Sequence, residues 1–196
     1  PLRLVGSEMC IRDRYYSEDA VLTSGQAVAF ISGGKEYGVI IAPKHLAFND
    51  TEINRTGVSV FMTEQQAREN ELRGTQAAIE DAGALGIMTA FNRVGITAAN
   101  AHTGLLKNIL RGEWGFKGLE SQDFIMNPNY AVLKEYALNG GTMTTFTGEN
   151  TMAAVSEKFA YWTTENVGQD TELMSAIKQA MTWQAYALAN SNAMDG

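Results

Sequence analysis

The 196-residue sequence predicts an α/β protein of about four β/α units, which corresponds to half of a (β/α)8 barrel. Three observations support this fold class. Short apolar runs alternate with segments patterned as helices, which is typical of a parallel sheet covered by helices. No glycine-rich phosphate loop follows any run, which disfavours a doubly wound nucleotide-binding sheet. Polar residues instead follow the predicted strand ends, where a barrel places its chemistry.

Four short apolar runs are predicted as strands. They cover residues 38–42, 85–90, 118–122 and 141–146. The polar residues that follow them are Lys44 and His45, the segment 91–93, Gln122 and Asp123, and Thr147. The carboxyl ends of parallel barrel strands meet at one rim, so these side chains are expected to gather there.

The first two predicted helices carry recognisable start and stop signals. Thr63 and Gln66 form a capping box for a helix that begins near Glu64, and Gly83 lies where a C-terminal cap would end it. The second helix is expected to stop at Gly112. Its apolar stripe consists of Leu105, Leu106, Ile109 and Leu110. His102 is expected to be an exposed residue of this helix.

Two more helices are predicted in the second half of the chain. Asn127 followed by Pro128 is a start signal, with Asn as the N-cap and Pro in the first turn. The last helix is predicted from its periodicity. Its apolar stripe consists of Leu173, Ile177, Met181 and Leu188.

The first residues are not expected to belong to the barrel. Residues 4–14 read like one translated frame of a transposase adapter used to prepare DNA sequencing libraries. Residues 1–14 are therefore interpreted as an artefact that packs poorly, and Cys10 as foreign to the protein. The partial barrel domain is expected over residues 15–196, with residues 165–196 as a trailing helical segment.

Composition excludes several classes of function. A hydrophobic content of 45% with 19% charged residues fits a globular chain. The net charge of −7, without clustered Lys and Arg, argues against a nucleic-acid partner. No apolar run approaches the roughly 20 residues of a membrane span. With one cysteine and no ligand cluster, neither a metal nor a cofactor is expected.

Four motifs, taken together, resemble glycoside hydrolase family 3 in its β-glucosidase-like branch. They are Tyr16-Ser-Glu-Asp19, the segment from Lys44 to Arg55, Met88-Thr-Ala-Phe91-Asn92, and Arg111 to Gly118 followed by Ser121-Gln-Asp123-Phe124. Each motif is weak alone, but their order and spacing match the family. The resemblance runs from about residue 15 to at least residue 149 and implies the C-terminal half of a TIM-type barrel, incomplete in this chain.

The resemblance implies a role for each site residue. Asp123 would be the catalytic nucleophile of a retaining mechanism, in which two carboxyl groups flank the glycosidic bond. Without the motif, Asp123 would be taken as a helix-capping residue. The residues expected to bind the sugar are Lys44, His45, Arg55, Met88, Phe91 and Phe124. The basic side chains would bond hydroxyl groups, and Phe124 stands where the family often has a tryptophan platform.

The sequence departs from the family at two positions near the nucleophile. Phe91 replaces a tyrosine whose hydroxyl often supports the nucleophile. Glu120 stands inside a strand where the family has an apolar residue, and an unpaired carboxylate there would cost several kcal/mol or take up a proton. The acid/base glutamate of the family usually lies in a separate α/β sandwich domain, which is expected in a missing part of the same parent chain.

The leading hypothesis is an exo-acting β-glycosidase, most like a β-glucosidase, that acts on a β-glycoside. The segment by itself is expected to be inactive. A rival in the same fold is β-N-acetylhexosaminidase, whose branch carries an Asp-Ser-His motif that is not found after Lys44. A non-catalytic carbohydrate-binding barrel is the other alternative, and Asp123 argues against it. Related proteins occur inside bacteria, in the periplasm and at cell surfaces, so a bacterial source is expected and the compartment is left open.

Overall fold

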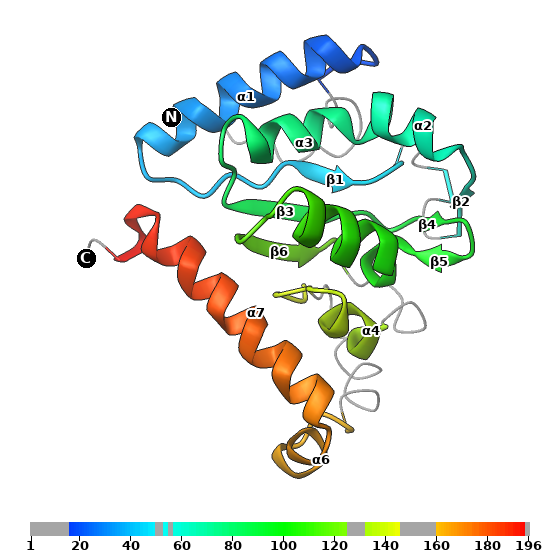
Figure 1. Ribbon diagram of the computed structural model, residues 1–196, viewed down its shortest axis with the longest axis vertical. Coiled ribbons are helices and arrows are strands. Elements are labelled where there is room, and N and C mark those ends of the chain that lie inside the picture. Colours follow the sequence, from blue (N-terminus) through cyan, green and yellow to red (C-terminus); the bar gives the residue numbers. More distant parts are fainter. Residues whose placement is uncertain (1–15, 50–52, 55–56, 125–131, 146–159, 195–196) are drawn as a thin grey trace.

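The computed structural model describes residues 16–49, 53, 54, 57–124, 132–145 and 160–194. Strands and helices alternate through its first two thirds, as predicted, and helices follow (Figure 1). The elements are α1 (Ala20–Glu36), β1 (Lys44–Leu46), β2 (Ser59–Val60), α2 (Glu64–Gln66), the π-helix η1 (Ala67–Glu71), α3 (Arg73–Glu80), β3 (Gly86–Thr89), β4 (Arg93–Val94), β5 (Thr97–Ala98), the 3-10 helix η2 (Ala99–Ala101), the π-helix η3 (Gly104–Glu113), β6 (Leu119–Gln122), α4 (Leu133–Leu138), α6 (Thr164–Gln169), α7 (Thr171–Ala189) and the 3-10 helix η5 (Asn192–Met194).

The main sheet holds three parallel strands in the order β1-β3-β6. Within this sheet, each strand lies beside the previous strand of the same sheet, and helices lie in the connections, as in a (β/α) barrel. A parallel bridge between Ser121 and Met143 marks a fourth strand position beyond β6. The predicted α/β class with a parallel sheet is confirmed, and strands 85–90 and 118–122 are found as β3 and β6.

The predicted first strand is wrong in its position. Residues 39–43 form no strand, and pairing begins at Lys44. Pro43 has no N–H group to donate to a ladder, and its carbonyl accepts a hydrogen bond from Met88 N at 3.1 Å. The apolar run lies instead against the start of β3, where a methyl group added at Gly86 would approach Ala42 to 3.0 Å.

The predicted fourth strand is also not formed as a strand over the described residues 141–145, where only Met143 makes a bridge. The amide groups of Thr142 and Met143 both donate to the carbonyl of Glu120, at 3.2 and 3.0 Å. Two neighbouring amides that share one acceptor cannot alternate between the two sides of a strand. The ladder therefore breaks at this point.

A second small sheet was not predicted from the sequence. It has the order β2-β4-β5, with β2 parallel and β5 antiparallel to β4. Its strands lie in the connections that follow β1 and β3, near the carboxyl ends of those strands (Figure 1). Strands of two residues show too little alternation to be recognised in a sequence.

The helix signals of the first half are confirmed. The Thr63 hydroxyl accepts a hydrogen bond from Gln66 N at 3.2 Å at the start of α2, and the helical stretch continues through η1 and α3. Gly83 follows its end with a positive φ of 64°, which glycine adopts readily, and donates to Ile79 O at 3.0 Å. Helix α1, which the sequence analysis did not predict, is capped by Asp19.

The second predicted helix is η3, and it ends at Glu113, one residue beyond Gly112. Its buried stripe contains Leu105, Leu106 and Leu110. The expectation for His102 was wrong. It lies before η3, half-buried, and its Nδ1 accepts a hydrogen bond from Leu105 N at 3.1 Å. Partial burial lowers the pKa of this imidazole, which suits a neutral acceptor.

The predicted stripe of the last helix is wrong in two of its members. Helix α7 buries Leu173, and Met181 and Leu188 are 63% and 42% exposed. The buried side is completed by Ala180 and Ala187, seven residues apart, which allow close approach to α4. The buried side of α7 is formed largely by small residues, so the stripe of large apolar residues did not predict which side is buried. The start signal at Asn127 lies outside the described residues.

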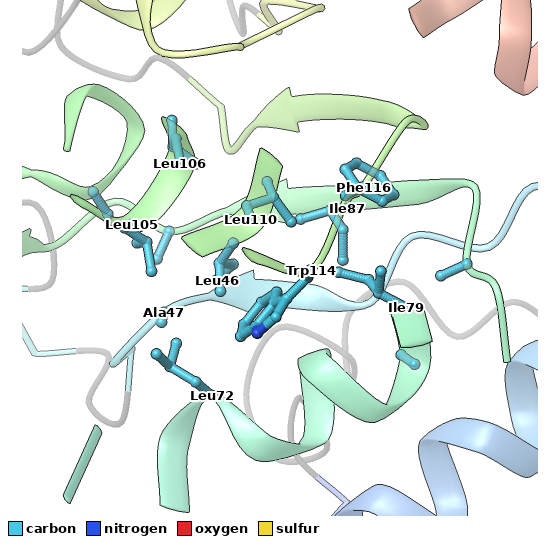
Figure 2. Close-up of a cluster of buried hydrophobic side chains, with 14 of the residues drawn as sticks. Leu46, Ala47, Leu72, Ile79, Ile87, Leu105, Leu106, Leu110, Trp114 and Phe116 are labelled. Carbon is cyan, nitrogen blue, oxygen red and sulfur yellow. The ribbon is translucent and has the colours of Figure 1, made fainter. Parts of the chain in front are cut away.

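The core lies between the main sheet and its helices. Figure 2 shows Leu46 and Ile87 from the sheet among Leu72 and Ile79, from the segment before β3, and the η3 leucines, with Trp114 and Phe116 in the same cluster. Ile87 is 1% exposed and Leu110 is fully buried. One face of the main sheet is therefore closed by helices, and the functional residues must be sought on the other face.

Candidate active site

A row of residues crosses the open face of the sheet. The register pairs Lys44 with Met88, Met88 with Ser121, and Ser121 with Met143. Residues in register on parallel strands point to the same face. Lys44 and Met88 are partly exposed and Met143 is 44% exposed, whereas Ile87, on the opposite face, is 1% exposed. Side-chain direction alternates along β3 and β6, so Met88 and Ser121 mark the face turned away from the helical core. Strand β1 does not alternate regularly, because its register shifts between Lys44 and Leu46.

Asp123 follows β6 directly, two residues beyond Ser121, and so belongs to the same open face. Its amide continues the ladder by donating to Thr89 O at 3.1 Å. Because the backbone is still held by β3 at this point, the position of the carboxylate is determined by the sheet. This places Asp123 at the carboxyl end of a parallel strand, where barrel enzymes carry their catalytic groups.

The carboxylate of Asp123 is held on both oxygens. His45 Nε2 lies 3.0 Å from Oδ2, and the Phe124 amide donates to Oδ1 at 2.9 Å. The side chain of His45 is 1% exposed and that of Asp123 is 5% exposed. A close contact between two side chains this well buried, together with the Phe124 amide on the other oxygen, restricts the carboxylate to one orientation. The structure thus joins two residues that stand 78 positions apart in the printed numbering.

The other expected site residues differ in how the structure describes them. Lys44 and Met88 lie side by side in the row on the open face. Phe91 follows β3 and is half-buried, and Phe124 is 42% exposed next to the nucleophile candidate. Arg55 lies outside the described residues. The peptide bond between Lys44 and His45 is cis. Their individual roles toward a sugar remain predictions.

Glu120 points away from the candidate site. It is in register with Ile87 on the helix-covered face and is fully buried. Thr89 donates to its Oε1 at 2.9 Å, and the Tyr136 hydroxyl donates to its backbone oxygen at 3.1 Å. Burial raises the pKa of this carboxyl to about 7, against the opposing effects of the Tyr136 and Thr89 hydroxyls and the Arg111 guanidinium.

The surroundings of Glu120 explain how a carboxyl group is tolerated in a barrel strand. Hydrogen bonds offset part of the cost of burial, and a pKa near neutrality allows the group to be neutral at moderately acid pH. Since it faces the helices, Glu120 cannot serve as the second carboxyl beside Asp123.

Two side-chain amide contacts at the rim were not predicted from the sequence, one part-buried and one buried. Asn100 donates to the Gln122 side chain at 2.6 Å, next to Asp123. Asn92 donates to the backbone oxygen of Ala47 at 3.1 Å, next to the His45 strand. The available signal for Asn92 was its place at the end of the Met88–Asn92 motif. For Asn100 there was no signal, because the short helix η2 that carries it was not predicted.

Within the described ranges, no group of three or more His, Cys, Asp or Glu side chains is placed to hold a metal ion. In the same part of the chain, no helix has the length and hydropathy of a membrane span. The site offers an oriented carboxylate beside an imidazole, on an open face that also carries a lysine.

Comparison with known proteins agrees with this geometry. Residues 6–180 match the family described as "Glycosyl hydrolase family 3 N terminal domain". The chain is 40% identical over 109 residues to "Probable beta-glucosidase J" of Emericella nidulans, and 37% identical over 109 residues to a "Beta-glucosidase" of Rhizobium radiobacter. Each alignment covers 56% of this chain and 13% of the relative, so the chain spans a small part of these proteins.

Solved structures show the same relationship at the level of the fold. "Beta-glucosidase 3B from Thermotoga neapolitana", solved with glucose, superimposes with a TM-score of 0.78 at 25% identity, over 92% of this chain and 25% of that one. The β-glucosidase of Kluyveromyces marxianus gives a TM-score of 0.66 at 26% identity. These relatives include fungi as well as bacteria, so they do not support the bacterial source that was expected.

Proposed function

Because the chain belongs to glycosyl hydrolase family 3, we propose that it forms part of the catalytic barrel of a retaining, exo-acting β-glucosidase with Asp123 as nucleophile. One observation carries the proposal. The Asp123 carboxylate stands at the carboxyl end of a parallel strand and is held on both oxygens, by His45 and by the Phe124 amide. The similar curated proteins and solved structures are described as β-glucosidases, which favours glucose over other sugars.

In this mechanism Asp123 attacks the anomeric carbon and forms a glycosyl-enzyme, which water then hydrolyses. The contacts on both oxygens keep the carboxylate in one orientation before the attack, which lowers the entropic part of the barrier. The carboxylate gives up its negative charge as the glycosyl ester forms and regains it when water releases the sugar. His45 Nε2, 3.0 Å from Oδ2, lies beside this returning charge. The amide of Phe124 remains fixed by the backbone throughout.

Retention also needs a second carboxyl group about 5–5.5 Å from the nucleophile, to protonate the leaving oxygen. Glu120 lies on the helix-covered face and does not fill this role. We therefore assign the acid/base to another domain of a longer parent chain. The 13% coverage of the curated relatives leaves room for such a domain.

The remaining site residues are proposed to form the sugar subsite. Lys44, and Arg55 outside the described residues, would donate to sugar hydroxyls. Met88 and Phe91 would form the apolar wall, and Phe124, partly exposed beside Asp123, would pack against the apolar face of the ring. Within the chain, residues 15–196 are proposed as barrel, with the helical part 165–196 trailing, and residues 1–14 as foreign.

The test is covalent trapping in the longer protein that carries this segment. A 2-deoxy-2-fluoroglucoside with a good leaving group should label a single peptide, and mass spectrometry should place the label on Asp123. Asp123→Asn should remove the labelling and lower the turnover of nitrophenyl β-glucoside by at least about a thousandfold, because an amide is a very poor nucleophile. Asp81→Asn, at an exposed position after α3, is the matched control and should retain both properties.

Three results would overturn parts of the proposal. A label on another carboxyl group would refute the assignment of Asp123. Turnover of nitrophenyl N-acetyl-β-glucosaminide in place of the glucoside would favour the hexosaminidase alternative. Binding of glucose without any turnover or labelling would favour a non-catalytic barrel.

A further inference from the structure

The carbonyl of Ala47 is a buried acceptor just beyond the end of β1. The last ladder contact of this strand is Ala90 N to Leu46 O at 2.8 Å. Ala47 is 2% exposed, so water does not readily reach its carbonyl. A buried carbonyl that lacks a donor costs about 1–3 kcal/mol. The donor comes from a side chain, because Asn92 Nδ2 lies 3.1 Å from Ala47 O.

Asn92 is itself fixed in place. It is 1% exposed, and its backbone oxygen accepts a hydrogen bond from Ala99 N, in η2, at 3.0 Å. Its side-chain nitrogen has a second, longer contact with Arg93 O at 3.4 Å. The amide therefore reaches Ala47 from a rigid position after β3 and connects the rims of β3 and β1.

Ala47 stands two residues after His45, and His45 contacts Asp123 at 3.0 Å. A continuous set of contacts thus runs from the β3 rim through Ala47 to His45, and from His45 to the carboxylate on β6. We propose that Asn92 is a positioning residue that holds the end of β1 and so orients His45 against Asp123. This inference rests on the proposed function, because it assigns Asn92 an effect on the reactivity of Asp123.

The chain provides a matched control for this contact. Asn139 is also buried, at 7% exposure, and its Nδ2 donates to the backbone oxygen of Ala101 at 2.9 Å. As with Asn92, a side-chain amide donates to a buried backbone carbonyl. Asn139, however, follows the end of α4 and connects this helix to η2. Replacing either residue by Leu removes one amide donor from a buried carbonyl, so the effects on melting temperature should be similar.

The experiment is a double-mutant cycle in the longer protein, with the rate of Asp123 labelling by the fluoroglucoside as readout. Asn92→Leu should lower this rate about tenfold, and Asn139→Leu less than twofold. In a His45→Ala background, Asn92→Leu should have almost no further effect, because the group that it orients is gone. A residue with a merely structural role would lower the rate by the same factor in both backgrounds, and that result would overturn the proposal.

Three further outcomes are informative. If Asn92→Leu does not fold, Asn92→Ser, whose hydroxyl is too short to reach Ala47, is expected to show the same loss and the same dependence on His45. A normal labelling rate in a soluble Asn92 variant would overturn the inference while leaving the function intact. Failure of the wild-type protein to be labelled at Asp123 would instead refute the proposed function.

Discussion

Asp123 and Glu120 show how the direction of a single side chain separates two carboxyl groups that stand three residues apart. Asp123 shares the open face with Lys44 and Met88, and Glu120 faces the helices with Ile87. Asp123 contacts an imidazole, whereas Glu120 contacts hydroxyl groups and has a pKa of about 7. The same chemical group therefore serves as a candidate nucleophile in one place and as a buried structural acid in the other.

The pKa of Glu120 predicts a specific dependence of stability on pH. The folded-state pKa, about 7, is above the ordinary value of 4.5, so the native state binds more protons than the unfolded state between these values. The free energy of unfolding should be highest below pH 4.5, as far as this group is concerned, and should fall as pH rises to about 7. The loss from this one group is on the order of 3 kcal/mol.

Denaturant unfolding of the wild type and Glu120→Gln between pH 4.5 and pH 8 measures this effect. The Gln variant should lack this part of the slope, and its relative stability should improve above pH 7. Glu36→Gln, at an exposed position in α1, is the control and should leave the slope unchanged. Equal slopes for the wild type and Glu120→Gln would contradict the prediction.

At the scale of elements, one arginine joins η3 to the entry of β6 and to the helices α4 and α7. Arg111 in η3 donates to Phe116 O and Gly118 O, both at 2.9 Å, and twice to Gly140 O after α4. Its guanidinium group lies 3.8 Å from the centre of a ring of Trp183 in α7. Burial lowers its pKa to about 10, and the attraction of Glu120 opposes that shift.

Arg111→Lys is therefore expected to be a severe change despite the retained charge. An ammonium group cannot form the planar set of bonds to three carbonyl groups, nor stack on Trp183. The expected loss in the free energy of unfolding is about 2–4 kcal/mol, because buried carbonyls lose their donor. Arg68→Lys is the control, since Arg68 forms its double contact with Glu113 at the surface. An equal or larger loss for Arg68→Lys would contradict this view.

At the scale of the whole molecule, the described sheet is open on the face that carries the candidate site. Three paired strands and one bridge leave Lys44, Met88 and Met143 partly exposed on that face. The superposition with the Thermotoga neapolitana β-glucosidase covers 92% of this chain but only 25% of that protein. A closed barrel would add further strands at the edges of this sheet, so that the open face would line the interior and the site would become an enclosed pocket.

The chain as printed is accordingly expected not to hydrolyse aryl β-glucosides, whereas the longer protein is expected to do so. The described part supplies Asp123 but places Glu120 on the wrong face to act as acid/base. Nitrophenol release from a panel of aryl glycosides, with both proteins at equal concentration, measures the difference. Clear turnover by the purified 196-residue chain would show that the acid/base lies within it.

Some features were determined by the sequence alone because they depend on neighbouring residues. The cap at Thr63 and the end of its helix near Gly83 follow from local hydrogen bonding and backbone conformation. The alternation of apolar runs and helical patterns predicts the α/β class, and the motifs around Asp123 predict the family. Placing Asp123 just after a strand required no knowledge of its distant contacts.

The tertiary structure decided the features that depend on pairing between distant segments. Whether β1 begins before or after Pro43 depends on which groups of β3 it meets, and the side of α7 that is buried depends on α4. The sequence does not show which face of β6 carries Glu120. A strand that is buried on both faces lacks the alternation of apolar and polar residues that would distinguish them. The contact between His45 and Asp123, and the amide of Asn92 behind it, exist only because three parallel strands end together at one rim.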